Sequence, residues 1–234
     1  MMLDVQGLQA AYGASQVLFD ISLQVGEGEC VSLMGRNGMG KTTTIRTVMG
    51  LLEAKAGGIA FLGQPITGLA PEAIARRGIG LVPEGRQIFS TLTVRENLVA
   101  TSADRRNSAK PWTLQRVFDL FPRLHERRTQ WARTLSGGEQ QMLAIGRALL
   151  TNPRLMILDE ATEGLAPVIR AEIWKCLETL KAEGQSILVV DKNVSVLRRL
   201  ADRHVVIEKG RTVWSGDGAA LDRDLEKVHT YVGL

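Results

Sequence analysis

Short apolar runs alternate with helical patterns over the first 84 residues of the chain. The runs predict strands over Leu3–Leu8, Val17–Val25, Glu29–Met34, Ile59–Leu62 and Ile79–Val82. Between them, Lys41–Leu51 has the apolar periodicity of a helix, and Pro71–Arg77 predicts a short helix that begins on proline. This alternation is typical of an α/β domain built on a largely parallel sheet.

Residues 85–150 differ from the chain on either side. Strand signals are few here, and helical periodicity predominates around Thr93–Ala103 and Leu114–Leu124. We therefore predict a helical subdomain inserted in an α/β core, which residues 1–84 and 151–234 form. The whole chain, 1–234, is then expected to be a single domain with an additional antiparallel β part.

After residue 150 the alternation of strands and helices resumes. The pattern predicts strands at Leu155–Asp159, Ser186–Val190, His204–Glu208 and Thr212–Ser215, and helices at Pro167–Ala182, Val194–Ala201 and the C-terminal end. Earlier in the chain, the polar stretch Arg105–Lys110 is predicted to be a flexible loop.

The composition is that of a globular protein. The chain has 234 residues, of which 44% are hydrophobic and 23% charged. Its apolar runs are far shorter than the roughly 20 residues that span a bilayer, and its N-terminus does not resemble an export signal. Cys30 and Cys176 have no metal or redox spacing, so we expect two inert thiols in a reducing compartment.

The positive charge leaves alternatives open. The net charge is +4, and arginines occur in adjacent pairs such as Arg76-Arg77 and Arg198-Arg199. Such clusters can bind nucleic acid or an anionic membrane surface. Because no aromatic residues interleave with them, we expect solvated helix faces first and proximity to the inner membrane leaflet second, with no nucleic acid partner.

Residues 35–42 read Gly-Arg-Asn-Gly-Met-Gly-Lys-Thr, a phosphate-binding loop between a strand and a helix. Its glycines free the backbone to wrap a triphosphate with N–H groups. Lys41 offers a cation to the β/γ-phosphates, and the Thr42 hydroxyl offers a ligand to Mg²⁺. The predicted nucleotide contacts are Gly35, Arg36, Asn37, Gly38, Met39, Gly40, Lys41, Thr42 and Thr43.

Two further segments carry polar chemistry. Asp159 follows four apolar residues, so its carboxylate emerges at the end of a buried strand and can meet Mg²⁺, directly or through water. Ser136 precedes Glu139 by three residues, which is a capping box that begins a helix. Gly137 and Gly138 leave the N–H groups of the first turn bare, which favours anion binding.

In this order, the phosphate loop, Leu135–Gln140 and Leu155–Glu160 closely resemble the motifs of ABC transporter ATP-binding subunits. The resemblance covers nearly the whole chain. It implies ATP hydrolysis with Mg²⁺, with Glu160 orienting or deprotonating the attacking water and Tyr12 stacking on adenine. It also implies that Ser136–Glu139 binds the γ-phosphate of ATP held by another subunit, so that chemistry needs two cassettes.

The resemblance implies partners that lie outside this chain. These are a second ATPase subunit, either another copy or a related cassette, two transmembrane permease subunits and, indirectly, a periplasmic solute-binding protein. It further implies a cytoplasmic protein bound peripherally to the inner face of the cell membrane.

Four segments narrow the resemblance to the smaller-type ATPase subunit of branched-chain amino acid importers. They are Val82–Arg86, Leu120–Arg128, Gly138–Ala144 and Gly164–Pro167. Urea and short-chain amide importers have a very similar subunit and are the near alternative. A nucleotide-dependent clamp with weak hydrolysis, and an ABC protein acting on DNA or ribosomes, are two further hypotheses. The last usually carries two cassettes or long insertions, and this sequence shows neither.

The sequence departs from the usual ABC pattern at several positions. Glu84 stands where most members have Gln, and it suits Mg²⁺. Lys192 stands where most have His, so a cation is present there without an acceptor or a proton that titrates near neutral pH. Ala161 and Glu163 alter the inter-subunit contact. We predict Thr42, Glu84 and Asp159 as metal ligands, and Glu160 and Lys192 as catalytic residues.

Overall fold

The computed structural model describes residues 1–105, 108 and 110–233. The predicted flexible loop over Arg105–Lys110 lies partly outside the described residues.

All the named strands of the described chain belong to one ten-stranded sheet, in the order β5-β4-β1-β2-β10-β9-β3-β8-β7-β6. The strands span β1 Leu3–Tyr12, β2 Ser15–Val25, β3 Cys30–Met34, β4 Ala54–Phe61, β5 Gln64–Pro65, β6 Ile79–Val82, β7 Leu155–Asp159, β8 Ser186–Val190, β9 Arg203–Glu208 and β10 Arg211–Asp217. β3 and β6 to β9 pair in parallel, whereas β1, β2, β4 and β5 pair antiparallel. The sheet therefore has the mixed character that the sequence predicts.

The parallel strands are buried on both faces because helices cover both sides of the sheet. In β7, Leu155 and Ile157 enter one apolar core, while Met156 and Leu158 enter the other. Continuous apolar runs such as this one satisfy two cores at once, which explains why they show no alternation in the sequence.

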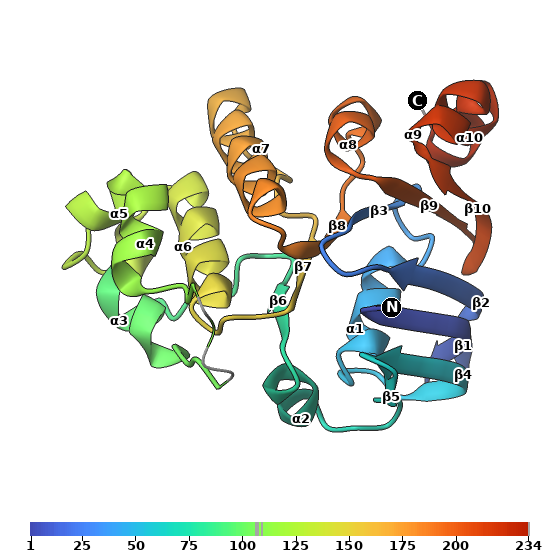
Figure 1. Ribbon diagram of the computed structural model, residues 1–234, viewed down its shortest axis with the longest axis horizontal. Coiled ribbons are helices and arrows are strands. Elements are labelled where there is room, and N and C mark those ends of the chain that lie inside the picture. Colours follow the sequence, from blue (N-terminus) through green and yellow to red (C-terminus); the bar gives the residue numbers. More distant parts are fainter. Residues whose placement is uncertain (106–107, 109, 234) are drawn as a thin grey trace.

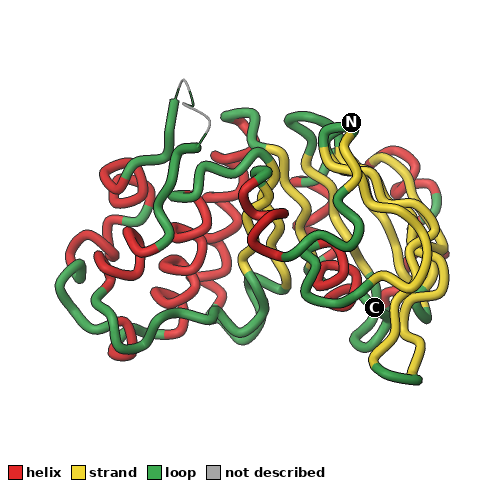
Figure 2. Tube along the Cα trace, turned by 90° about the horizontal axis from the view of Figure 1, so that it is seen from below, coloured by secondary structure: helices red, strands yellow, loops and turns green. Residues whose placement is uncertain are grey.

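The helices of the described chain span α1 Lys41–Val48, α2 Pro71–Arg76, α3 Val94–Ala100, α4 Leu114–Leu120, α5 Pro122–Glu126, α6 Gly137–Leu149, α7 Pro167–Ala182, α8 Val194–Leu200, α9 Gly218–Arg223 and α10 Leu225–Val232, with a 3₁₀ turn at Ala132–Thr134. Helices α3 to α6 gather at one end of the molecule, away from the antiparallel strands (Figures 1 and 2). We call this group the helical lobe.

Two boundaries differ from the sequence predictions. The helix predicted over Leu114–Leu124 is broken into α4 and α5, because Pro122 lacks an N–H group and disfavours helical dihedrals at Phe121. The helix predicted to run to Leu51 ends at Val48, close to Gly50, which has φ of +69°.

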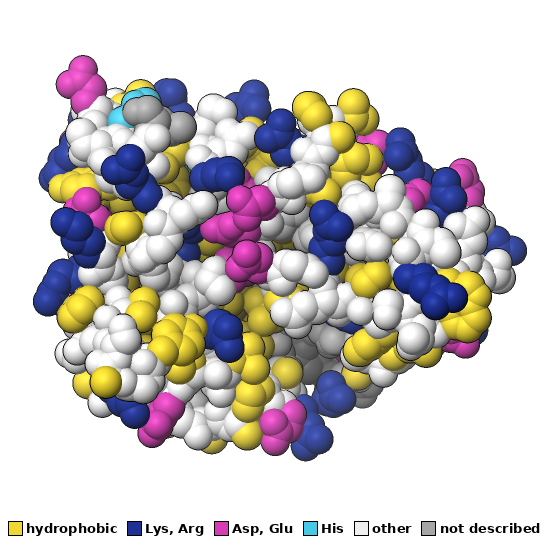
Figure 3. Space-filling model, turned by 180° about the vertical axis from the view of Figure 1, so that it is seen from behind, with side chains coloured by type: hydrophobic (Ala, Val, Ile, Leu, Met, Phe, Trp, Pro, Cys, Tyr) yellow, Lys and Arg dark blue, Asp and Glu magenta, His cyan; other side chains and the backbone are white. Residues whose placement is uncertain are grey.

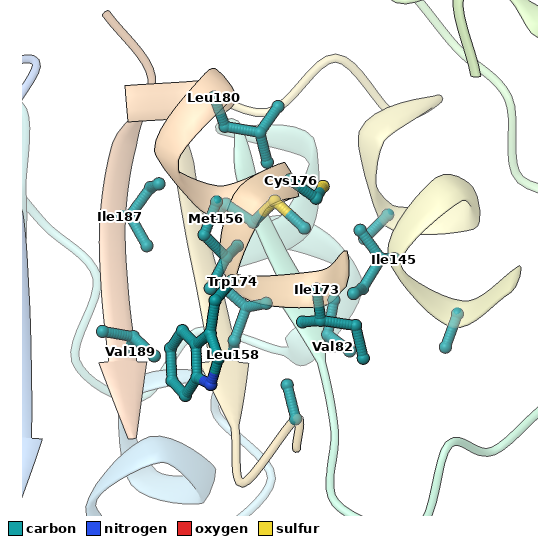
Figure 4. Close-up of a cluster of buried hydrophobic side chains, with 14 of the residues drawn as sticks. Val82, Ile145, Met156, Leu158, Ile173, Trp174, Cys176, Leu180, Ile187 and Val189 are labelled. Carbon is teal, nitrogen blue, oxygen red and sulfur yellow. The ribbon is translucent and has the colours of Figure 1, made fainter. Parts of the chain in front are cut away.

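The lobe and the sheet share one apolar core. Helices α6 and α7 pack over β6, β7 and β8, with Val82, Ile145, Leu158 and Ile173 among the buried side chains (Figure 4). Truncating Leu158, which is fully buried here, should cost about 2–5 kcal/mol of the free energy of unfolding. This core fixes where the polar ends of β3 and β7 lie relative to α6.

Candidate functional site

The phosphate loop connects β3 to α1, and its glycines serve different purposes. Gly38 has φ of +79°, and a Cβ added to it would meet no atom within 4 Å, so this side of the loop is open. Gly35 has φ of +151°, and a Cβ there would come within 2.4 Å of the Ile207 carbonyl oxygen on β9. Gly38 thus leaves room for a ligand, whereas Gly35 permits close packing on the sheet.

The turn between β9 and β10 holds the loop from behind. The Gly210 N–H donates to the Met39 carbonyl oxygen at 3.0 Å, and the Lys209 N–H donates to the Met39 sulfur at 3.2 Å. Both turn residues lie more than a hundred positions away in the sequence. The shape of the loop therefore depends on the finished sheet.

Lys41 begins α1 and is only 4% exposed. Its Nζ donates to the carbonyl oxygens of Gly35 at 3.0 Å and Arg36 at 3.2 Å, and lies 3.3 Å from Glu160 Oε1. The ammonium is therefore held inside the curve of the loop by oxygen atoms. The N-terminus of α1 adds further positive potential at the same place.

Thr42 and Asp159 meet across the sheet edge. The Thr42 hydroxyl donates to Asp159 Oδ1 at 3.2 Å, and Asp159 is 3% exposed. Burial, with a contribution from Glu84, raises the pKa of Asp159 to about 6, while the hydrogen bond from Thr42 and the charge of Lys41 act in the opposite direction. The Thr42 hydroxyl and the buried Asp159 carboxylate therefore form a pair of oxygen donors that fits Mg²⁺.

Three carboxylates gather beside this pair. Oxygens of Glu84, Glu160 and Glu163 lie within 4.8 Å of one another. Burial and the hydrogen bond with Glu163 raise the pKa of Glu160 to about 7, despite the opposing charge of Lys41. A carboxylate with a pKa near neutrality is suited to accept a proton from water. The backbone of Glu160 is held by a hydrogen bond from its N–H to the Val190 carbonyl at 3.0 Å.

A cleft of about 410 Å³, which we call the phosphate cleft, is lined by most of these groups. It is lined by Val17, Asn37, Gly38, Gly40, Lys41, Thr42, Thr43, Glu84, Glu160 and Glu163. Val17 and Glu163 are not among the predicted site residues. Glu163 carries a signal, since it stands beside the Asp-Glu pair where the usual pattern has a smaller residue, whereas Val17 gives none beyond its place in an apolar run.

Lys192 does not line this cleft. It is 63% exposed, and its Nζ lies 3.0 Å from Glu163 Oε1, an ion pair that raises the pKa of Lys192. Both residues border a smaller hollow of about 270 Å³, which Glu160 also lines. Lys192 therefore reaches the site through a carboxylate that itself contacts Glu160.

Ser136 caps α6 at a different place. The Glu139 N–H donates to the Ser136 hydroxyl at 3.3 Å, and the Ser136 N–H donates to Glu139 Oε2 at 2.8 Å. A Cβ on Gly137 would meet the Arg86 guanidinium, and a Cβ on Gly138 would meet Ile169. None of Ser136–Glu139 lines the phosphate cleft. This chain thus presents two separate groups of predicted nucleotide-binding residues.

Tyr12 is the last residue of β1, which extends beyond the strand predicted over Leu3–Leu8. It is 42% exposed, and the Arg46 guanidinium lies 5.8 Å from the centre of its ring. Its predicted stacking on adenine remains a prediction.

Figure 3 shows the face of the molecule opposite to the one seen in Figure 1. Acidic side chains gather near the middle of this face, and Lys and Arg side chains are scattered around them rather than forming one basic stripe. On this face, the basic side chains do not form the patch or stripe that is typical of surfaces that bind nucleic acid.

Comparison with known proteins agrees with this arrangement. Residues 18–163 match the ABC transporter family. The chain belongs to this family. It is an ATP-binding, ATP-hydrolysing subunit of an ABC transporter, and its α/β cassette fold is the one predicted from the sequence.

Two curated relatives cover almost the full chain. The high-affinity branched-chain amino acid transport ATP-binding protein BraG of Pseudomonas aeruginosa is 43% identical over 99% of this chain and 100% of its own length. The lipopolysaccharide export system ATP-binding protein LptB of Escherichia coli is 34% identical over 99% of this chain and 97% of its own. The relatives thus include both an amino acid transport protein and an exporter subunit.

Solved structures give the same fold. The ATP-binding subunit of an ABC transporter superposes with a TM-score of 0.86 at 29% identity and covers 100% of both chains. A nucleotide-free ATP-binding cassette gives a TM-score of 0.86 at 25% identity, covering 100% of this chain and 98% of its own. Within the described residues, each helix is too short or too polar to span a membrane.

Proposed function

We propose that this chain powers an ABC importer of branched-chain amino acids from the cytoplasmic face of the membrane. The observation that carries this proposal is the match to BraG, which is 43% identical and runs nearly from end to end of both proteins. The exporter subunit LptB matches over a similar length at 34% identity. The choice of a branched-chain amino acid importer over an exporter therefore rests on the higher sequence identity to BraG than to LptB.

Different residues in and beside the cleft would bind the phosphates of ATP, hold Mg²⁺ and act on water. Lys41 and the backbone of the loop would hold the β- and γ-phosphates, and Thr42 and Asp159 would hold Mg²⁺, with Glu84 near enough to contribute. Bound Mg²⁺ would neutralise phosphate charge. Glu160 would orient or deprotonate water, because its carboxylate lies in the cleft and burial raises its pKa to about 7.

The start of α6 would serve a second cassette. Ser136 and the first-turn N–H groups lie outside the cleft of their own chain, so they are free to face ATP bound elsewhere. Two cassettes would then complete each other's sites, and two permeases would couple their closure to transport. A binding protein outside the membrane would deliver the solute.

Uptake by whole cells tests the transported solute. Cells lacking this gene, complemented with the wild-type chain or with Lys41→Ala, would be given labelled leucine, urea or acetamide. The proposal expects the wild-type chain to restore leucine uptake and Lys41→Ala to leave it absent. Restored urea or acetamide uptake, with leucine uptake unchanged, would replace this proposal by the short-chain amide alternative.

Turnover of the assembled transporter tests the clamp hypothesis. The subunits would be purified together from membranes, and phosphate release would be measured with and without the binding protein and leucine. The proposal expects turnover that leucine stimulates. ATP binding and subunit closure without turnover would favour a clamp.

A further inference from the structure

The capping box at the start of α6 contains a buried carboxylate. Glu139 is 6% exposed, and its Oε2 accepts the Ser136 N–H at 2.8 Å. The Glu139 carboxylate therefore helps to fix the backbone of Ser136, whose hydroxyl in turn accepts the Glu139 N–H. A buried carboxylate is stable as an anion only when it has partners.

The second oxygen of Glu139 has such a partner. Arg127, which directly follows α5, places its Nε 2.6 Å from Glu139 Oε1. Its Nη1 also donates to Gln130 Oε1 at 3.2 Å, so the guanidinium is held from two sides. Burial alone would raise the pKa of Glu139, but the hydrogen bonds from Ser136, together with Arg127 and Arg123, outweigh it and lower the pKa below its usual value.

The chain contains a second capping box that lacks this arrangement. At the start of α3, Thr93 and Glu96 exchange the same reciprocal hydrogen bonds, at 2.8 and 3.2 Å. Glu96 is exposed, and in the described part of the chain no ion pair to it is found. Both boxes thus share the reciprocal bonds, but they differ in the burial of the glutamate and in its close ion pair with an arginine, since Arg95 acts on Glu96 only from a longer distance.

This difference indicates that the capping box of α6 has a role beyond beginning the helix. An exposed box is sufficient to begin a helix, as α3 shows. At α6, the box also has to keep Ser136 and the bare N–H groups of Gly137 and Gly138 in one arrangement while an anion approaches. An approaching phosphate repels an unneutralised carboxylate, and a guanidinium on the far oxygen offsets that repulsion.

We propose that Arg127 is a positioning residue for ATP hydrolysis, which holds Glu139 as a fixed anion so that Ser136 stays aligned toward the nucleotide of the second cassette. This inference rests on the proposed pairing of cassettes. Arg127 acts through Glu139 and contacts no nucleotide itself.

Exchange of backbone amide hydrogens in the single chain tests the positioning step without any partner. Arg127→Met removes the charge and keeps the side-chain length, and Arg127→Lys restores a cation. Arg128→Met is the matched control, because Arg128 is exposed and its side chain bonds only the His125 carbonyl among the contacts of the described residues. We expect the amides of Ser136 and Glu139, which are the two that are hydrogen-bonded within the capping box, to exchange roughly tenfold faster in Arg127→Met and to recover in Arg127→Lys. Equal exchange in Arg127→Met and Arg128→Met would overturn the proposal.

Turnover of the assembled transporter tests the catalytic consequence. Arg127→Met should lower kcat roughly tenfold and raise KM for ATP, because Ser136 would also contribute to ATP-driven pairing, while ATP binding to the single chain should stay within about twofold of the wild type, since its phosphate loop is untouched. Arg127→Lys should recover most of kcat, and Arg128→Met should match the wild type. A normal kcat in Arg127→Met would overturn the role in hydrolysis.

A third measurement separates failure of this inference from failure of the proposed pairing. In a Glu160→Gln background, MgATP should bring cassettes together, and light scattering would detect the pair. Pairing that survives in Arg127→Met at wild-type ATP concentrations overturns the inference. If the Glu160→Gln parent itself pairs neither alone nor with its natural partner, the proposed pairing is wrong, and the catalytic part of the inference is overturned with it.

Discussion

The phosphate cleft and the start of α6 are both predicted to bind phosphate, yet they are built in different ways. The cleft joins residues far apart in the sequence, such as Thr42 in the first turn of α1 and Glu160 directly after β7. The start of α6 takes its groups from one short stretch, in which Arg127, Ser136 and Glu139 lie close in sequence. The cleft therefore depends on the sheet, and the α6 site depends on local capping.

This difference teaches what each region can do alone. The cleft contains a cation and a candidate base, and the Thr42–Asp159 oxygen pair lies beside it, so this region is where we propose that ATP binds and water is activated. The start of α6 offers N–H groups and a hydroxyl, which can stabilise charge but cannot accept a proton from water as readily. Loss of the cleft should therefore affect ATP binding and water activation, whereas loss of the start of α6 should affect the stabilisation of charge.

Lys41→Ala should have the largest effect, because it removes the buried cation inside the phosphate loop. We expect ATP turnover to fall by at least about 100-fold and binding of MgATP to weaken sharply. Calorimetry on the single chain and phosphate release by the assembled transporter measure the two effects. Tight MgATP binding by the variant would show that the loop backbone alone supplies the affinity.

Glu160→Gln should separate binding from chemistry within the cleft. The change removes the candidate base and keeps the shape of the side chain, so turnover should fall by about 10²–10⁴-fold while ATP still binds. The variant should accumulate as an ATP-bound pair. Turnover close to that of the wild type would assign the base to another residue, with Glu163, whose carboxyl group hydrogen-bonds Glu160, the next candidate.

Ser136→Arg and Lys192→Ala should differ in the assembled transporter. An arginine at Ser136 obstructs the start of α6, so turnover should fall strongly. Lys192 is exposed, and its ion pair with Glu163 should be worth only about 0–1 kcal/mol, so its loss should lower turnover modestly. A strong loss from Lys192→Ala with little from Ser136→Arg would reverse the comparison between the two regions.

Acidification should give the smallest effect, and it should act on the sheet below the cleft rather than on α6. His204 on β9 is fully buried beside the Ser32 hydroxyl on β3, with Nδ1 at 2.7 Å from Oγ, and burial lowers its pKa. The neutral form is therefore preferred in the folded state. As pH falls below about 6.5, the unfolded chain takes up the His204 proton first, so the contribution of His204 to stability falls by at most about 1.4 kcal/mol per pH unit. The raised pKa values of Asp159 and Glu160 act in the opposite direction, because the folded chain takes up those protons first.

Hydrogen-exchange protection factors at pH 7.5 and 5.5 check this prediction. The ratio of wild-type to His204→Gln protection in β3 and β9 should be smaller at pH 5.5 than at pH 7.5. Equal losses of protection in the wild type and in His204→Gln would assign the pH effect to other groups.

Most elements of the fold could be predicted from the sequence because their signals are local. The run Leu155–Asp159 is a strand with those bounds, and Pro167–Ala182 is a helix with those bounds. The predictions failed at boundaries such as Phe121, where the proline that follows breaks a helix that periodicity alone continues. Strand β1 also extends to Tyr12, beyond its predicted end, because pairing with β2 and β4 supports residues with weak signals.

The sequence by itself determined which segments carry chemistry, because the phosphate loop, the Asp-Glu pair and the capping box are each a few consecutive residues. Only the tertiary structure decided how they meet. It placed Gly35 against the Ile207 carbonyl, Lys41 beside Glu160, and Lys192 on Glu163 rather than in the cleft. The physical reason is that these contacts form between strand ends that parallel pairing brings to one edge of the sheet, and no local pattern records the distance between them.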